Sequence, residues 1–282
     1  MEIQWYPGHM AKSMRSLKER IRLTDVVAEV LDARAPGSTL NPDLDELFAK
    51  RPRLLVLNKA DLADPEITSQ WVAYYRNRGQ AALAFSVPVD APDILKKAIG
   101  EAARDTVEKY RQKGMRKTVR VMVAGVPNVG KSAIINRMAG KSRLKEENKP
   151  GITRGLQWVR IGPHLELMDT PGVLWPKFED QHTAAKVAFI GSIKAEIMDA
   201  EELAMILLEI LRDMAPELLR GRYGVDGTGG NGVNIMENIA KKRGFLLKKG
   251  EYDFERTAKT VLSEFRSGTI GRFSLEKPGE LS

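Results

Sequence analysis

The chain has 282 residues, a formal net charge of +8 and no cysteine, with 43% hydrophobic and 29% charged residues. This length and composition suit a globular protein of one large or two ordinary domains, and the lack of cysteine excludes a disulfide framework and a thiolate metal site. No apolar run approaches the roughly 18 residues of a membrane span. The first residues lack the pattern of a signal peptide, so we expect a cytoplasmic protein without membrane contact.

The positive charge is concentrated in the first part of the chain. Residues 1–175 hold 29 Lys and Arg against 20 Asp and Glu, whereas residues 176–282 hold 16 against 17. Basic residues gather within 12–22, 111–120 and 141–154. Such clusters serve either solubility or attraction to a polyanion such as nucleic acid. Composition alone leaves both explanations open.

Residues 11–112 alternate between amphipathic helices and apolar strands. The pattern predicts helices at 11–23, from Pro42, at 65–78 and at 94–112, and strands at 26–31, 54–57 and 81–87. This alternation indicates a parallel sheet covered by helices on both faces. Ligands of such sheets bind beyond the carboxyl ends of the strands. Residues 58–61 and Ser86 both fall at such ends.

A phosphate-binding loop follows the next predicted strand, residues 119–124. The residues Gly125, Gly130, Lys131 and Ser132 fit the pattern G-x-x-x-x-G-K-[ST]. The glycines let successive N–H groups point at phosphate oxygens, and the helix predicted at 133–140 adds its positive end. Lys131 can bridge the β- and γ-phosphates, and the Ser132 hydroxyl can ligate Mg²⁺. The stretch predicts binding of a nucleoside triphosphate.

The tetrapeptide Asn58-Lys59-Ala60-Asp61 has the form N-K-x-D. Guanine presents two donors on one edge, N1–H and the exocyclic amine, and the carboxylate of Asp61 can accept both. The Lys59 stem can lie along the purine face, while Asn58 offers both donors and acceptors. Such a tetrapeptide is a weak signal alone. Beside a phosphate loop in the same α/β domain it indicates guanine.

Two further predicted strands, 156–161 and 165–168, lead to Asp169-Thr170-Pro171-Gly172, of the form D-x-x-G. Asp169 can hold Mg²⁺ through a water, and the N–H of Gly172 can sense the γ-phosphate. The polar loop 141–155 is either disordered or functional. Within it, Thr153 is a candidate hydroxyl ligand for Mg²⁺, with plain loop solvation as the alternative.

The character of the sequence changes near Pro176. Strand signals vanish, and helices are predicted at 184–193, 200–214, 233–242 and 254–265. We therefore divide the chain into an α/β domain, residues 1–176, and an all-helical domain, residues 177–282.

Together these motifs resemble the GTPase superfamily, but in an unusual order. Residues 58–61 and Ser86 precede the phosphate loop, whereas ordinary GTPases place N-K-x-D last. With the opening Trp5-Tyr6-Pro7-Gly8-His9-Met10, the chain resembles the circularly permuted GTPases of the YlqF/RbgA type, which assist assembly of the large ribosomal subunit. The resemblance implies a circularly permuted Ras-like P-loop GTPase domain, with a mostly parallel sheet, followed by a helical domain that contacts ribosomal RNA.

The resemblance also implies roles for individual residues. Nucleotide contacts carry over onto Asn58, Lys59, Asp61, Ser86, Asn128, Val129, Gly130, Lys131, Ser132, Ala133 and Gly172. Mg²⁺ ligation carries over onto Ser132, Thr153 and Asp169, and hydrolysis onto His9, Lys131, Thr153 and Gly172. Two departures stand out. Ala133 replaces a threonine that contacts the α-phosphate, and Ser86-Val87-Pro88 replaces the usual S-A-K/L turn that supports guanine.

Val173 follows the D-x-x-G motif, where Ras-like enzymes place a glutamine that orients water. A valine cannot do so, and we expect slow intrinsic turnover with help from elsewhere. By resemblance His9 is a candidate for that help, with a packing role as the alternative. Related GTPases with asparagine at the position of Asn128 bind K⁺.

We predict a Mg²⁺-dependent GTPase that binds the precursor of the large ribosomal subunit with GTP and leaves after hydrolysis. The alternative is an RNA-binding assembly factor that uses GTP occupancy as a sensor with negligible hydrolysis. A free-standing metabolic GTPase has no substrate-binding signature to support it. A monomer is the default expectation.

Overall fold

The computed structural model describes residues 8–140, 157–175, 180–193, 199–225, 230–248 and 250–279, with side chains from Lys12 onward. Its described strands form one six-stranded sheet in the order β3-β2-β1-β4-β6-β5. The strands are β1 (Val26–Asp32), β2 (Arg53–Asn58), β3 (Ala81–Ala84), β4 (Val119–Ala124), β5 (Gln157–Gly162) and β6 (Leu165–Asp169). Neighbouring strands are parallel except β5, which pairs antiparallel with β6.

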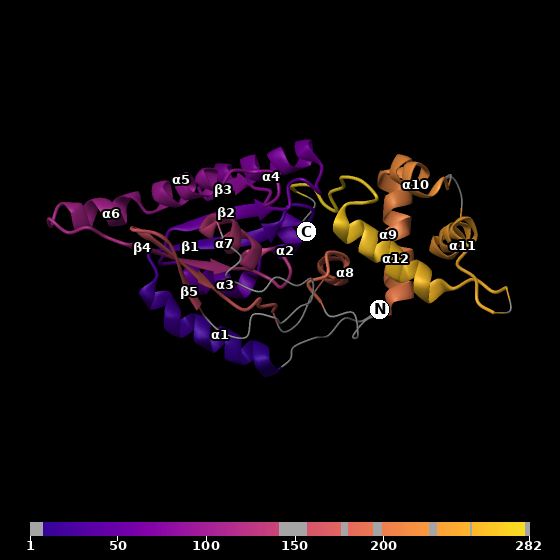
Figure 1. The fold of residues 1–282 in the computed structure, drawn as a ribbon, viewed down its shortest axis with the longest axis horizontal. Coiled ribbons are helices and arrows are strands. Elements are labelled where there is room, and N and C mark those ends of the chain that lie inside the picture. The colour runs from indigo at the N-terminus through magenta and orange to yellow at the C-terminus, as the bar shows by residue number, and fades with distance from the viewer. Residues whose placement is uncertain are drawn as a thin grey trace.

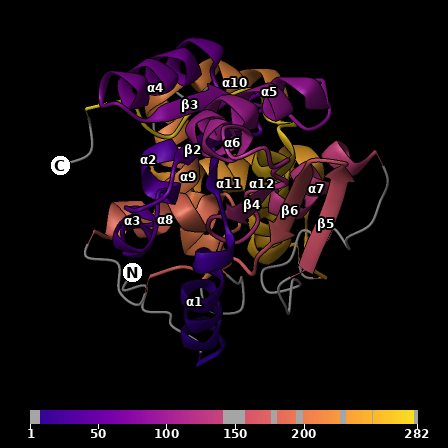
Figure 2. The ribbon, with the colours of Figure 1, turned by 90° about the vertical axis from the view of Figure 1, so that its left-hand side faces the viewer.

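The sheet is buried on both faces because successive side chains of a strand point to opposite sides. On β1, Val26 and Val30 join the core beneath α5 (Pro92–Ala102) and α7 (Lys131–Ala139). Val27 and Leu31 face the cores on the other side. That side is covered by α1 (Gly8–Arg20), α3 (Pro42–Phe48) and α4 (Pro65–Asn77). Figure 2 shows α3 and α4 on one side of the sheet and α5 and α7 on the other.

The phosphate-loop strand β4 lies between β1 and β6 at the centre of the sheet. It pairs with β1, and Val26 lies opposite Val121. This pairing joins the strands that precede α5 and α6 (Arg104–Arg111) to those that follow these two helices in the sequence. The motif-bearing loops thus meet at one edge despite their permuted order. The predicted α/β fold with a mostly parallel sheet is confirmed.

The helical part beyond the sheet consists of α8 (Gln181–Phe189), α9 (Ala200–Met214), α10 (Pro216–Tyr223), α11 (Gly232–Arg243) and α12 (Phe254–Ser267). Figure 1 shows α9 to α12 beside the sheet. The main apolar core continues from the α5 and α7 face of the sheet into these helices. The division at residues 176 and 177 stays a prediction. No described helix has the length and apolar character needed to cross a membrane.

Several details differ from the sequence-based expectation: β3, for example, ends at Ala84, whereas the strand was predicted at 81–87. The predicted helix 94–112 is two helices, because the backbone at Ala103 (φ −89°, ψ −1°) leaves the α-helical path. No proline or glycine marks that position, so the sequence does not predict the break. Short helices also form at α2 (Pro36–Thr39) and α10, where none was predicted, and a 3-10 turn at Ile21–Leu23 follows α1.

Candidate nucleotide-binding site

The phosphate loop connects β4 to α7, and two of its glycines are required by close backbone approaches. Gly125 has φ +141°, and a Cβ there would lie 2.3 Å from the main-chain oxygen of Val30. Gly130 has φ +97°, and a Cβ there would lie 2.3 Å from Nδ2 of Asn58. L-residues rarely adopt such φ values. The loop therefore fits tightly between β1 and the guanine loop, our name for residues 58–61.

Lys131 is buried at the start of α7, with 6% of its surface exposed. Its Nζ donates a 2.8 Å hydrogen bond to the main-chain oxygen of Val126, within the phosphate loop. Burial lowers the pKa of Lys131 to about 8, although the charge of Asp169 opposes the shift. The side chain is a cation held within a cradle of backbone, where a phosphate group would be stabilised.

The two described residues predicted to hold Mg²⁺ lie side by side. The Ser132 hydroxyl donates a 2.8 Å hydrogen bond to Oδ2 of Asp169. A hydroxyl and a carboxylate are hard oxygen donors that suit Mg²⁺, which usually keeps waters and phosphate oxygens as its other ligands. The described residues hold no group of three or more acidic or histidine side chains around a common metal position. This pair therefore fits a metal brought in with phosphates.

The guanine loop contacts the phosphate loop directly. Asn58 donates through Nδ2 to the main-chain oxygen of Val129 at 2.8 Å, and Lys59 Nζ donates to that of Asn128 at 2.6 Å. Lys59 Nζ also pairs with Asp32 at 3.0 Å. Oδ1 of Asn58 is buried and has no hydrogen-bond partner among the described residues. A buried unpaired polar atom at this position fits a site that takes a ligand.

Ser86 holds the carboxylate predicted to read guanine. Its hydroxyl donates a 2.7 Å hydrogen bond to Oδ1 of Asp61, and its own N–H donates to Asp90 at 2.7 Å. Ala60 N–H donates to the main-chain oxygen of Phe85 at 3.1 Å. Ser86 lies here although the turn Ser86-Val87-Pro88 departs from the usual S-A-K/L pattern. The geometry gives it an orienting position beside Asp61.

The D-x-x-G turn lies against the phosphate loop. A Cβ on Gly172 would lie 2.6 Å from the backbone of Pro127, so only glycine fits there. The next residue, Val173, is 1% exposed and packs into the core beneath α1 and α3. Its main-chain oxygen accepts a 2.9 Å hydrogen bond from Asn41. Val173 is therefore a core residue.

Two predicted site residues fall outside this geometry. Thr153 lies outside the described residues, and so does the side chain of His9, although the backbone of α1 begins at Gly8. Ala133 occupies the first turn of α7, directly after Ser132. The described nucleotide-site residues thus come from β2, the turn after β3, the β4–α7 loop and the end of β6, and they meet at one edge of the sheet.

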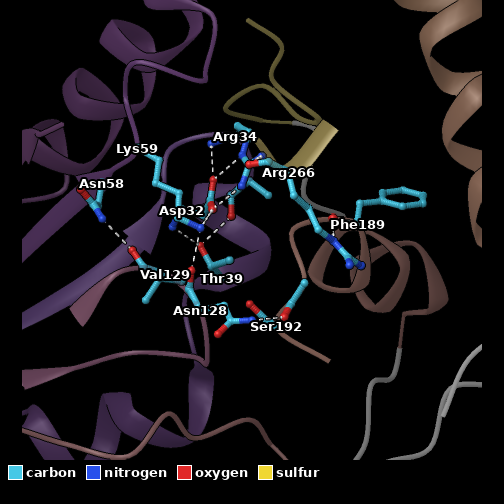
Figure 3. A network of polar contacts seen from close by, with 12 residues as sticks. Asp32, Arg34, Thr39, Asn58, Lys59, Asn128, Val129, Phe189, Ser192 and Arg266 are labelled. Carbon is cyan, nitrogen blue, oxygen red and sulfur yellow. Dashed lines mark hydrogen bonds and ion pairs between the residues drawn. The ribbon is translucent and has the colours of Figure 1, made fainter. Parts of the chain in front are cut away.

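Sequence reasoning missed a buried polar network behind the guanine loop, which Figure 3 shows. Asp32 accepts hydrogen bonds from Arg34 at 2.9 and 2.8 Å and pairs with Lys59. Burial alone would raise the pKa of Asp32, but the charges of Arg34 and Lys59 outweigh it and lower that pKa. The signal in the sequence that could have revealed this network is that two charged residues, Asp32 and Arg34, follow the apolar strand predicted at 26–31.

The phosphate loop is also tied to the turn after α8. The side-chain amide of Asn128 donates a 2.6 Å hydrogen bond to the main-chain oxygen of Gly191, and Ser192 donates one of 2.5 Å to that of Pro127. Asn128 has φ +62°, an uncommon conformation for a residue other than glycine. The helical part of the chain therefore holds the phosphate loop in a strained conformation.

The sheet order, the phosphate loop and the guanine loop define a circularly permuted P-loop GTPase. A family model described as 50S ribosome-binding GTPase matches residues 120–218. Ribosome biogenesis GTPase A of Priestia megaterium is 41% identical over 285 residues, which cover 99% of this chain and 98% of that protein. The protein of the same name from Thermotoga maritima is 31% identical, with 99% and 96% covered.

The structure of GNP-bound YlqF from T. maritima superimposes with a TM-score of 0.69 at 28% identity, covering 96% of this chain and 100% of that one. The chain belongs to the ribosome biogenesis GTPase A family. It is accordingly a GTPase with GTP and GDP as ligands.

Proposed function

We propose that the protein hydrolyses GTP during maturation of the bacterial large (50S) ribosomal subunit. It binds the subunit precursor in its GTP form and is released after hydrolysis. The names of its relatives and of the matching family model support this assignment. The burial of Val173 is the observation that supports dependence of hydrolysis on a partner. It leaves the position after D-x-x-G without a group that could orient water.

The described residues receive GTP in the following way. Asp61, oriented by Ser86, accepts the two donors of the guanine edge, and the Lys59 stem lies along the base. Lys131 exchanges its contact with Val126 for the β- and γ-phosphates, since a phosphate oxygen is a stronger acceptor for an ammonium than a neutral carbonyl. The N–H of Gly172 senses the γ-phosphate.

Ser132 and Asp169 would hold Mg²⁺, together with Thr153, which is outside the described residues. Bound Mg²⁺ supplies positive charge against the phosphate oxygens. The 2.8 Å contact between Ser132 and Asp169 sets their oxygens close enough to share one ion. The side-chain oxygen of Asn128 is the proposed protein ligand for K⁺, which would add a second positive charge near the phosphates.

Intrinsic hydrolysis is slow in this proposal, and the ribosomal particle stimulates it. His9 orients the attacking water when the protein is bound to the particle. The competing role for His9 is packing at the start of α1. A His9→Ala variant that keeps particle-stimulated hydrolysis would assign it to packing.

The helical domain contacts ribosomal RNA in the same proposal, and the protein acts as a cytoplasmic monomer. The competing function is an RNA-binding assembly factor whose GTP occupancy serves as a sensor. Thr153→Ala separates the two, because it should retain GTP without cleaving it. A variant trapped on the particle supports the enzyme, and normal subunit assembly supports the sensor.

The first measurement is GTP hydrolysis with and without purified large ribosomal subunits, in K⁺ and in Na⁺ buffer. Stimulation of roughly tenfold, which corresponds to about 1.4 kcal/mol of barrier, supports the proposed enzyme. Tight GTP-dependent binding without stimulation supports the sensor. Equal rates in K⁺ and Na⁺ remove the role proposed for Asn128.

A further inference from the structure

The chain returns from the helical part to the guanine loop after α12. We name residues 268–276 the C-terminal strap, and Figure 1 shows this segment in yellow between α12 and the sheet. Arg272 of the strap donates two hydrogen bonds of 3.0 Å, from Nη2 to the main-chain oxygen of Ala60 and from Nε to that of Ala63. Ala60 lies within the guanine loop itself. One guanidinium therefore clamps the backbone on both sides of Asp61.

The backbone of the strap continues this contact. Phe273 N–H donates to the main-chain oxygen of Leu62 at 3.0 Å, and Asp64 N–H donates to the Ser274 hydroxyl at 3.2 Å. At the other end, a Cβ on Gly268 would lie 2.6 Å from Cδ2 of Leu62, so the turn after α12 packs directly against the residue that follows Asp61. The strap thus contacts Ala60 in the guanine loop and each of the three residues that follow the loop, Leu62, Ala63 and Asp64.

The strap is firmly anchored at its far end. Glu276 is fully buried, and its carboxylate accepts from Ser38 N–H at 2.9 Å, from the Ser38 hydroxyl at 2.5 Å and from Lys186 Nζ at 3.0 Å. Its main-chain oxygen accepts from Trp71 Nε1 at 3.1 Å. A buried carboxylate is stable only when donors such as these compensate for the lost water. The strap therefore has a fixed path.

A second route joins α12 to the lysine of the guanine loop. Arg34 Nη1 donates to the main-chain oxygen of Phe265 at 3.1 Å, near the end of α12, and the same guanidinium holds Asp32. Asp32 pairs with Lys59 at 3.0 Å. Leu275 of the strap donates to the main-chain oxygen of Arg34 at 2.7 Å. Figure 3 shows the polar part of this network.

The guanine loop needs such support because Lys59 has φ +61°. The left-handed conformation costs a residue with a side chain free energy, and it persists only where neighbouring structure imposes it. We propose that the C-terminal strap positions the guanine loop for base recognition, with Arg272 as the positioning residue on which the preference for guanine depends. This inference rests on the proposed assignment of Asp61 to the guanine edge.

The test compares GDP with inosine diphosphate, whose base lacks the exocyclic amine and so offers Asp61 one donor fewer. Affinities for both are measured by calorimetry on the full chain. Arg272→Ala should weaken GDP binding by about tenfold and inosine diphosphate binding by less, so that the preference for GDP falls. Arg272→Lys, which can keep one of the two hydrogen bonds, should lie between Arg272→Ala and the unmodified protein. Ser274→Ala should act in the same direction as Arg272→Ala.

The matched control is Lys259→Ala, which removes an exposed positive charge on α12 that pairs with Glu255 of the same helix. It should change neither affinity. Unchanged GDP binding in a folded Arg272→Ala variant overturns the proposal. An equal loss for both nucleotides also overturns it, because that result describes general loosening of the site.

Asp61→Asn separates failure of the strap from failure of the guanine assignment. Its amide should prefer xanthosine diphosphate, whose base carries an acceptor where guanine carries the amine. If Asp61→Asn switches preference while Arg272→Ala leaves the GDP preference unchanged, only the strap proposal fails. If Asp61→Asn still prefers GDP, the guanine assignment fails and the strap proposal fails with it.

Discussion

Asn58 donates a 2.8 Å hydrogen bond to the main-chain oxygen of Val129, joining the guanine loop to the phosphate loop across 71 residues of sequence. A Cβ on Gly130 would lie only 2.3 Å from the same Nδ2 atom, which is closer than two such atoms can approach. The hydrogen bond and the close approach therefore fix the distance between the guanine loop and the phosphate loop at this point. Glycine at position 130 serves the contact between the loops as well as the approach to phosphate.

Gly130→Ala should abolish this arrangement. The added methyl group collides with Asn58, and φ +97° is strained for alanine, so we expect at least a tenfold loss of GDP affinity and about 1–3 kcal/mol of stability. Calorimetry with GDP and thermal unfolding measure the two effects. Gly140→Ala is the matched control, because Gly140 has φ +65° and, among the described residues, no atom within 4 Å of its Cβ position. Equal GDP affinities in the two variants would show that the contact between Gly130 and Asn58 does not support nucleotide binding.

The affinity for nucleotide should depend on pH through Lys131. In the free protein burial lowers the pKa of Lys131 to about 8, whereas a bound phosphate favours the charged form. Binding therefore takes up a proton when the pH exceeds about 8, and affinity falls as the pH rises, by at most about tenfold per unit. Titration with GDP from about pH 7 to pH 9, in buffers of different ionisation enthalpy, measures the uptake. A flat profile without proton uptake would refute this.

The individual strands and the motif-bearing loops could be predicted from the sequence because short local patterns mark both, whereas the order of the strands in the sheet was not predicted. Residues 119–124, apolar except for Arg120, form a run long enough to mark a strand, and the loop that follows has a fixed spacing of glycines. Since parallel strands end at one edge, the meeting of Asn58 with Val129 and of Ser132 with Asp169 follows from topology.

The supports behind the site could not be predicted in this way. Arg34 reaches a main-chain oxygen that lies 231 residues away, and Arg272 reaches Ala60 across 212 residues. No local pattern encodes such partners, and the main-chain oxygens that they contact carry no side-chain signature. The burial of Val173 was missed for the same reason, although its inability to orient water was evident from its type.

Stability should depend on pH through Glu29, which is fully buried on β1 and accepts a 2.7 Å hydrogen bond from Arg53 Nε. Burial raises the pKa of Glu29 from 4.5 to about 7, with Arg53 opposing the shift. The folded protein thus holds a proton that the unfolded chain releases, and the free energy of unfolding falls as the pH rises from about 4.5 to about 7. Glu29→Gln should remove this component of the pH dependence.

Urea unfolding at several pH values measures the free energy of unfolding of Glu29→Gln and of the unmodified protein. The difference between these two free energies should change by at most about 1.4 kcal/mol per pH unit between about pH 4.5 and about pH 7. The exposed Glu46→Gln is the control, and its curve should run parallel to that of the unmodified protein. A difference for Glu29→Gln that does not change with pH would contradict the prediction.

Val173→Gln tests whether the missing glutamine alone explains the slow intrinsic hydrolysis that we propose. Because Val173 is 1% exposed and packs into the core beneath α1 and α3, the new amide would be buried and should cost about 1–3 kcal/mol of stability. It should not raise the intrinsic rate of GTP hydrolysis, since the core holds the side chain away from the phosphates. Val173→Thr, with nearly the same shape, separates polarity from size in thermal unfolding. Hydrolysis assays without ribosomal particles decide the matter, and a rate increase of about tenfold in Val173→Gln would show that the side chain reaches the water.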